Sequence, residues 1–222
     1  MDFDGYLREG KKFLNKEEYL QAIEMFGVAL ILQPDNQEVR ELAITAANKQ
    51  TSQLLANEAK DRAESMGIKV EDIDKAIAEC TEESKLSIFY YIRGLISESK
   101  GERSRAIADY SKAIKNEPDY PLAFKKRGNA YLDNGDFDEA IADFEELIRL
   151  NKKYNQDNNA ANVGLGRAYM ERGVAYYKKG KSEEAIADWN KVFIYKPDDP
   201  NAKGLIEMAK AEKCGNSGFP FF

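Results

Sequence analysis

A pattern of residue types recurs four times along this chain of 222 residues, and it constrains the fold more than any other feature. Each copy has an aromatic residue followed four positions later by glycine. The pairs are Tyr6 and Gly10, Tyr90 and Gly94, Phe124 and Gly128, and Tyr169 and Gly173. The second and third copies follow each other directly, at a spacing of 34 residues from Tyr90 to Phe124. A fixed period of this length indicates stacked units of supersecondary structure.

The spacing inside each copy predicts two helices joined by a turn. A third position on the same face of the first helix holds Phe13, Ser97, Tyr131 and Tyr176. The turn carries Gly101, Gly135 and Gly180 in three copies. The second helix opens with Ala22, Ala106, Ala140 and Ala185, each followed by Ile and, four residues after the Ala, by Phe26, Tyr110, Phe144 and Trp189. Pro34, Pro118 and Pro197 mark its end, because proline cannot continue a helix.

The glycine in the middle of each first helix needs a reason. Glycine inside a helix costs about 1 kcal/mol relative to alanine. We therefore expect the paired helices to approach each other closely at all four glycines, with the aromatic residue filling the space beside the small ones.

The small, aromatic and proline positions together resemble the tetratricopeptide repeat. The resemblance implies an all-α fold, a right-handed superhelical array of antiparallel helix hairpins of the α-solenoid type. Three residues depart from the pattern: Lys152 stands where a proline is expected, Ser97 where an aromatic is usual, and Glu9 where an apolar residue is typical.

This resemblance predicts the organisation of the chain. The expected segments are a first repeat at 1–36, an irregular helical segment at 37–86 that could hide a degenerate repeat, repeats at 87–120 and 121–154, a loop insertion at 155–165, a repeat at 166–199, a capping helix at 200–213 and a flexible tail at 214–222. Within 37–86 we expect one long helix or a broken pair ended by Gly67, followed by a short helix.

The composition argues against catalysis and against several partners. The chain has no histidine, and its two cysteines, Cys80 and Cys214, lie in no metal or redox spacing, so we expect no catalytic residues, no metal and no cofactor. The net charge of −6 without a basic cluster argues against nucleic acid. There is no apolar stretch of 18 residues that could span a membrane. A cytoplasmic protein is expected, or an exported one whose signal peptide has been removed.

The first helix of each repeat lines a concave groove in the family that this chain resembles. Carried over, the partner-binding positions are Leu7, Lys11, Tyr91, Leu95, Lys125, Asn129, Leu132, Met170, Val174 and Tyr177, with Leu14, Ile88 and Leu122 beside them. Most are apolar, which favours an apolar peptide, a partner helix or the chain's own tail as the occupant. Alternatively, the helices within 37–86 cover part of this surface and make it core.

Some members of the family hold the terminal carboxylate of heat-shock chaperones with a lysine and an asparagine four residues apart. Lys125 and Asn129 match that first part. The next repeat has Glu171 where the clamp needs asparagine, and a negative charge there would repel a carboxylate. A full chaperone clamp is therefore not expected.

The resulting functional hypothesis is a noncatalytic protein–protein interaction scaffold that binds a peptide or partner helix in its groove. Two alternatives stay open. One is a structural subunit that forms a homo-oligomer through the C-terminal tail, which ends in Phe-Pro-Phe-Phe. The other is a small-molecule carrier, for which the sequence has no positive signature.

Overall fold

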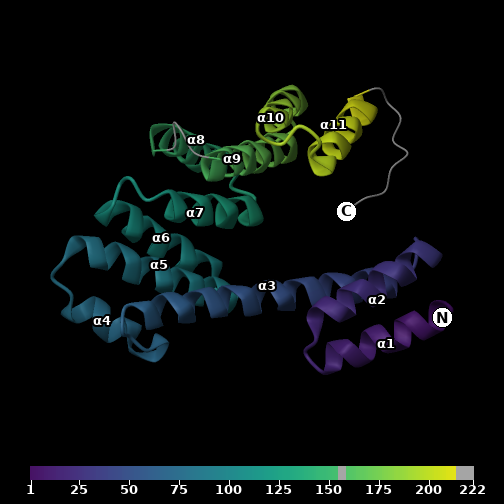
Figure 1. The fold of residues 1–222 in the computed structure, drawn as a ribbon, viewed down its shortest axis with the longest axis horizontal. Helices are drawn as coiled ribbons and strands as arrows, with labels where there is room; N and C mark the ends of the chain where they lie inside the picture. The colour runs from purple at the N-terminus through teal and green to yellow at the C-terminus, as the bar shows by residue number, and fades with distance from the viewer. Residues whose placement is uncertain (155–158, 214–222) are drawn as a thin grey trace. The chain divides into compact units, whose positions relative to one another are not determined.

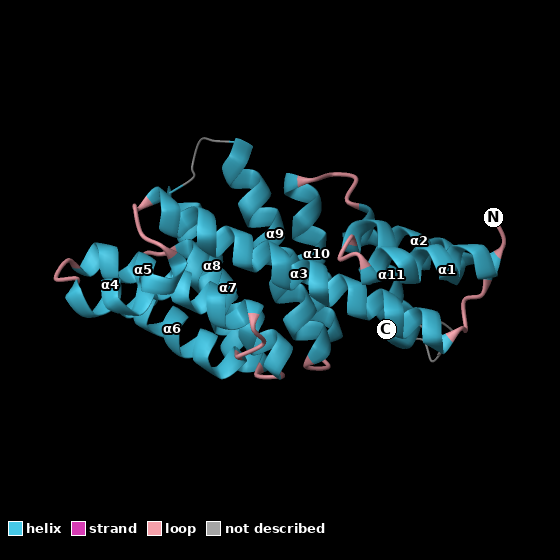
Figure 2. Ribbon diagram, turned by 90° about the horizontal axis from the view of Figure 1, so that it is seen from below, coloured by secondary structure: helices cyan, strands magenta, loops and turns pink. Residues whose placement is uncertain are grey.

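The computed structural model describes residues 1–154 and 159–213, and all regular structure in these residues is helical (Figures 1 and 2). The predicted all-α class is confirmed. The chain divides into two compact units. The first comprises residues 1–73 with 95–102, and the second comprises residues 74–94 with those from 103 onwards. Helix α5 contributes residues to both units.

The first unit is built mainly from the N-terminal helices. They are α1 (Phe3–Asn15), α2 (Tyr19–Leu32), α3 (Gln37–Ser65) and the 3-10 helix η1 (Val70–Asp72). Helix α1 packs on α2, and α2 packs on α3. Two of the helices have side-chain N-caps: Asp2 Oδ1 accepts from Gly5 N at 2.9 Å, and Asn36 Oδ1 accepts from Val39 N at 3.1 Å. Helix α3 is a single helix of 29 residues, which decides between the two expected forms of this segment.

The core of the first unit is small. One cluster consists of Ala22, Phe26, Ala29, Val39 and Ala46, and further along α3 the residues Leu55, Ala59 and Ala63 are also buried. A Cβ atom at Gly10 would lie 2.5 Å from Phe26 Cε1, so the first hairpin has the close approach that its glycine predicts.

The second unit contains the remaining helices. They are α4 (Ile73–Glu79), whose first residue belongs to the other unit, most of α5 (Glu83–Ser99), α6 (Arg103–Asn116), α7 (Pro121–Asn134), α8 (Phe137–Tyr154), α9 (Asn159–Lys178), α10 (Ser182–Tyr195) and α11 (Pro200–Lys213). From α6 to α11 each helix packs on the next, and α7 also contacts α9. This succession buries a continuous core along the helices, as stacked repeats require.

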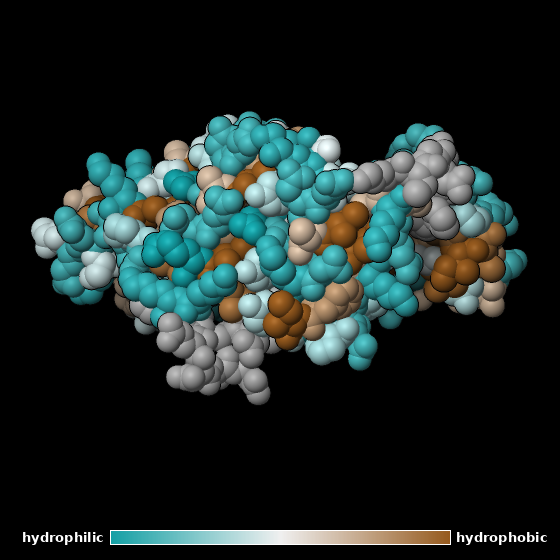
Figure 3. Space-filling view, turned by 90° about the horizontal axis from the view of Figure 1, so that it is seen from above, coloured by the Kyte–Doolittle hydropathy of each residue, from teal (hydrophilic) through white to brown (hydrophobic). Residues whose placement is uncertain are grey.

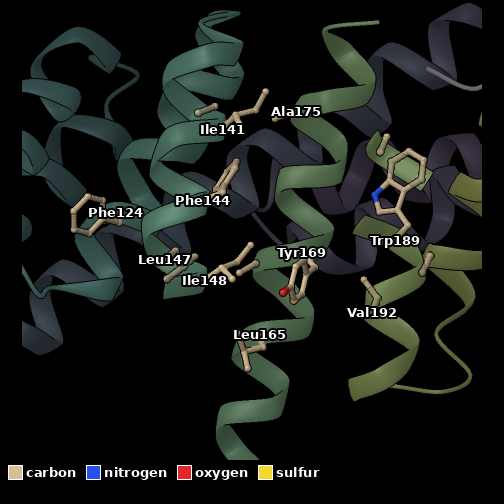
Figure 4. Packing of buried hydrophobic residues seen from close by; sticks show 14 of the residues in the cluster. Phe124, Ile141, Phe144, Leu147, Ile148, Leu165, Tyr169, Ala175, Trp189 and Val192 are labelled. Atoms are coloured by element: carbon tan, nitrogen blue, oxygen red, sulfur yellow. The ribbon is translucent and has the colours of Figure 1, made fainter. Parts of the chain in front are cut away.

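The interior of the second unit is apolar. Figure 4 shows Ile148 of α8 pointing toward Tyr169 of α9, and Phe144 and Leu165 belong to the same buried cluster. Trp189 of α10 belongs to the same cluster and is fully buried.

The same glycine contact recurs in the second unit. A Cβ atom would lie 2.4 Å from Tyr110 Cε1 at Gly94, 2.8 Å from Phe144 Cε1 at Gly128, and 2.4 Å from Trp189 Nε1 at Gly173. The expectation of close helix approach at each glycine is therefore confirmed.

Each turn between paired helices uses a left-handed residue. Gly101, Gly135 and Gly180 have φ of 77°, 88° and 81°. In the first hairpin the equivalent residue is Glu17, with φ of 61°, a region that side chains other than glycine rarely adopt.

The prediction of a loop at 155–165 is wrong over most of its length. Helix α9 begins at Asn159, and residues 155–158 lie outside the described residues. The glycines at and beside this stretch suggested a loop. In the structure Gly166 lies within α9 and allows this helix to pass close to Tyr195, because a Cβ atom added at Gly166 would lie 3.3 Å from Tyr195 Cβ. Tertiary packing thus offsets a weak local helix propensity. The predicted tail at 214–222 also lies outside the described residues.

Candidate functional site

Three buried ion pairs, which the sequence interpretation did not include, fix the hairpins of the second unit internally. Each joins the residue before the mid-helix glycine to an aspartate of the second helix, 16 residues later. The pairs are Arg93 with Asp109, Arg127 with Asp143, and Arg172 with Asp188. All are bidentate, with nitrogen–oxygen distances of 2.6–2.9 Å. This geometry is the strong form of an arginine–carboxylate contact.

The aspartates of these pairs are removed from water. Asp109 and Asp188 are both 2% exposed and Asp143 is 4% exposed. Burial raises the pKa of the Asp143 carboxyl, against the opposing effect of Arg127. Their charges are thus used inside the repeats and are not offered to a partner.

The first hairpin lacks this pair. Glu9 occupies the position of the arginine and Met25 the position of the aspartate. Glu9 departs not only from the apolar residue that is typical of the family but also from the paired arginine of the other three copies. Reading the Arg-Gly and Ala-Ile-Ala-Asp columns of those copies together would have found the pair.

The predicted groove residues of the first unit have different surroundings. Leu7 is half-buried against the apolar core of that unit. Lys11 is exposed, and its Nζ lies 2.6 Å from Glu38 Oε1 of α3. The positive charge of Lys11 is therefore already compensated within the chain.

Two predicted groove residues on α5 are not accessible. Tyr91 and Leu95 are both 0% exposed. The ring of Tyr91 packs against Tyr110 and Tyr120, with centroid distances of 5.7 and 5.3 Å. In this structure both residues belong to the packed interior and not to a binding surface.

Four predicted groove residues of the later repeats are half-buried against the core of the second unit: Leu132, Met170, Val174 and Tyr177. The backbone oxygen of Met170 accepts a hydrogen bond from Trp189 Nε1 at 3.3 Å. Burial, together with a hydrogen bond to Glu212 of α11, raises the pKa of Tyr177 to about 12. The hydroxyl of Tyr177 is therefore engaged by the last helix.

Lys125, the remaining basic position of the prediction, borders a cleft between α7, α8 and α9. Asn129 is half-buried one helical turn further along α7. The cleft has a volume of about 260 Å³, and its lining residues are Pro121, Leu122, Lys125, Leu147, Asn151, Gly164, Arg167, Ala168 and Glu171. Of these, Leu122 is exposed by 39%. The cleft combines an apolar wall with a few charged groups, a combination typical of ligand-binding concavities.

Glu171 is the acidic group of this cleft. Its Oε1 lies 3.6 Å from Lys125 Nζ, and its Oε2 is buried and has no hydrogen-bond partner in the part of the chain that the structure describes. Burial raises the pKa of the Glu171 carboxyl, while the charges of Lys125, Arg167 and Lys126 oppose that rise. A buried carboxylate oxygen without a hydrogen-bond partner is an uncommon feature.

Sequence reasoning missed part of this site. Gly164 lies in the stretch taken for a loop, and Arg167 lies just beyond it, outside the compared columns, so neither was considered as a wall of the groove. A helical reading of that stretch would have placed Arg167 one turn before Glu171.

The described residues contain no group of three histidine, cysteine, aspartate or glutamate side chains suited to a metal ion. Among the same residues, no helix is both long and apolar enough to cross a membrane. On the face shown in Figure 3, apolar patches are surrounded by hydrophilic residues.

The repeated hairpins, their glycine contacts and the cleft between first helices define the class of helical-repeat solenoid proteins. Sequence profiles of the tetratricopeptide repeat match residues 125–203 and 94–135. This chain is a tetratricopeptide-repeat protein.

The relatives that this chain matches include a longer protein. DnaJ homolog subfamily C member 3 of Gallus gallus is 26% identical over 157 residues, which cover 70% of this chain and 31% of the relative. The Homo sapiens protein of the same name is 32% identical over 73 residues, or 33% of this chain and 14% of that protein. The chain therefore matches less than a third of the length of these relatives.

Solved structures share the fold. The first TPR domain of Spaghetti (RPAP3), bound to the HSP90 peptide SRMEEVD, has a TM-score of 0.51 and 24% identity, and covers 59% of this chain and 95% of its own. A double mutant of MamA has a TM-score of 0.56 and 18% identity, with coverage of 75% and 86%.

Proposed function

We propose that this protein is a noncatalytic interaction scaffold that binds a peptide-like segment of a partner protein in the cleft between α7 and α9. The observation that carries the proposal is the cleft itself, with Leu122 exposed on its rim and Lys125, Arg167 and Glu171 among its lining residues. An apolar surface with a few placed charges suits an extended peptide, whose side chains alternate between buried and solvated.

The rest of the chain supports a binding role over a chemical one. The sequence has no histidine, and the buried aspartates are held by arginines. The net charge of −6 favours a protein partner over nucleic acid. The fold of the RPAP3 domain, which holds the HSP90 peptide, is compatible with peptide binding, although the proposal depends on the residues of this chain.

The alternatives have less support. Self-association through the tail depends on residues 214–222, outside the described part of the chain, and stays a prediction. A small-molecule carrier has no specific observation in its favour.

Selection from a random peptide library, followed by binding measurements on two surface variants, tests the proposal. Leu122→Glu places a charge on the rim of the cleft, in the first turn of α7, where an acidic residue is compatible with the helix. Ile194→Glu is the matched control, because Ile194 is 72% exposed on α10 and does not line the cleft.

Selected peptides should bind wild type and the Ile194→Glu variant equally, and the Leu122→Glu variant at least about tenfold more weakly, or about 1.4 kcal/mol. The proposal is wrong if the two variants bind alike, or if no selected peptide depends on Leu122.

A further inference from the structure

The contact between Lys125 and Glu171 is an incomplete ion pair. The distance of 3.6 Å from Lys125 Nζ to Glu171 Oε1 exceeds that of a charge-assisted hydrogen bond, which is about 2.7–2.9 Å. The second oxygen of Glu171 has no hydrogen-bond partner among the described residues. Lys125 is therefore occupied by a carboxylate that does not use its full bonding capacity, and a better-placed carboxylate could compete for it.

The charges at the cleft favour such competition. Lys125 and Arg167 line the cleft, and Glu171 is the only acidic residue among the lining residues that the structure describes. The side chain of Lys125 is 29% exposed and that of Glu171 is 23% exposed, so both can be reached from solvent. If Glu171 were neutral, two cations would face the cleft without an opposing charge, and an acidic group would be attracted.

A comparable pair in the first unit differs in quality. Lys11 on α1 contacts Glu38 on α3 at 2.6 Å, and both side chains are well exposed, by 45% and 61%. The side chain of Glu38 is thus largely open to water, whereas Glu171 has a buried oxygen. The pair of Lys11 and Glu38 supplies a matched control for the removal of a carboxylate from a lysine.

We propose that Glu171 is a built-in competitor of acidic partners: its carboxylate holds Lys125, and the cleft accepts a side-chain or terminal carboxylate of a partner peptide only when Glu171 is neutralised or displaced. This inference rests on the proposed peptide-binding role of the same cleft. Glu171 is the specificity determinant of the cleft, because it rejects acidic peptides by charge while leaving the apolar wall available.

The test compares two labelled peptides by fluorescence anisotropy. One is the heptapeptide ALALEEL with a free C-terminus, and the other is ALALQQL with a C-terminal amide, which has the same apolar residues without carboxylates. Each is titrated with wild type, with the Glu171→Gln variant and with the Glu38→Gln control. Glu171→Asn repeats the measurement with a shorter side chain, and circular dichroism verifies that each variant is folded.

The acidic peptide should bind Glu171→Gln at least about tenfold more tightly than wild type, and the Glu38→Gln control within about twofold of wild type. Adding Lys125→Met to Glu171→Gln should abolish the gain. The neutral peptide should gain nothing from either substitution at Glu171.

The inference is overturned if neither variant of Glu171 binds the acidic peptide more tightly, or if the neutral peptide gains equally. Such a failure is distinct from failure of the proposed function. Library peptides that still depend on Leu122 would leave the binding role of the cleft intact and remove only the role of Glu171.

Discussion

Replacing Gly173 by alanine should destabilise the fourth hairpin. The added Cβ would lie 2.4 Å from Trp189 Nε1 and 2.6 Å from Cδ1, far inside the ordinary contact distance of about 3.5–4 Å. Trp189 is 0% exposed, so its ring cannot move aside without displacing other core residues. Overpacking of this kind costs about 1–3 kcal/mol.

Two smaller effects modify this value. Moving the ring would weaken the hydrogen bond from Trp189 Nε1 to the backbone oxygen of Met170, and the loss of such a bond costs about 0.5–1.5 kcal/mol of stability. Alanine in turn has a helix propensity about 1 kcal/mol better than glycine. We therefore expect Gly173→Ala to lower the free energy of unfolding by about 2 kcal/mol.

Gly204→Ala is the matched control. Gly204 also lies inside a helix, α11, but an added Cβ would meet nothing within 4 Å. This substitution should raise stability by about 0.5–1 kcal/mol, since only the propensity term remains.

Urea denaturation followed by circular dichroism and by fluorescence of Trp189, the sole tryptophan, measures both variants. A Gly173→Ala protein as stable as wild type would show that the glycine is not required by the close approach of α9 and α10. A Gly204→Ala protein less stable than wild type would show that the higher helix propensity of alanine does not determine the effect at this position.

Two further substitutions test the charges of the second unit. Asp143→Asn leaves the buried guanidinium of Arg127 without its charged partner and should lower the free energy of unfolding by denaturant by about 3–5 kcal/mol. The control Asp138→Asn removes an exposed ion pair and should lower it by about 1 kcal/mol or less. Equal effects of the two substitutions would refute the distinction between the buried and the exposed pair. Burial raises the pKa of Glu171 above its ordinary value of 4.5, so the folded state binds the proton more tightly than the unfolded state and stability falls as the pH rises through that window. Glu171→Gln removes this contribution, and its stability relative to wild type should therefore increase as the pH rises above 4.5 in a series of melting curves; a constant difference would contradict the raised pKa.

The hairpins could be predicted from sequence because their determinants are local and repeated. The glycine at position 128 and the aromatic at 144 belong to one hairpin, and comparison of copies identifies both columns. The proline positions predicted helix ends for the same reason. Where proline is replaced by Lys152, α8 continues to Tyr154.

The accessibility of the predicted groove residues could be predicted less well, because it depends on neighbours that no single repeat contains. Tyr91 has the same register position as Lys125, yet it is fully buried whereas Lys125 lines a cleft. The cleft is also lined by Arg167, which precedes Tyr169, the first aromatic residue of the fourth copy. The long contact between Glu171 and Lys125 depends on the distance between two helices, which the sequence does not give.

The three arginine–aspartate pairs have a consequence for how such a chain can change. Each pair closes within its own hairpin, so the buried charge of one repeat is neutralised without help from the next. Duplicating or deleting a whole hairpin would therefore leave no orphaned charge of this kind at the new junction, and apolar faces alone would have to match. The buried charges therefore place no constraint of their own on the order in which such hairpins are stacked.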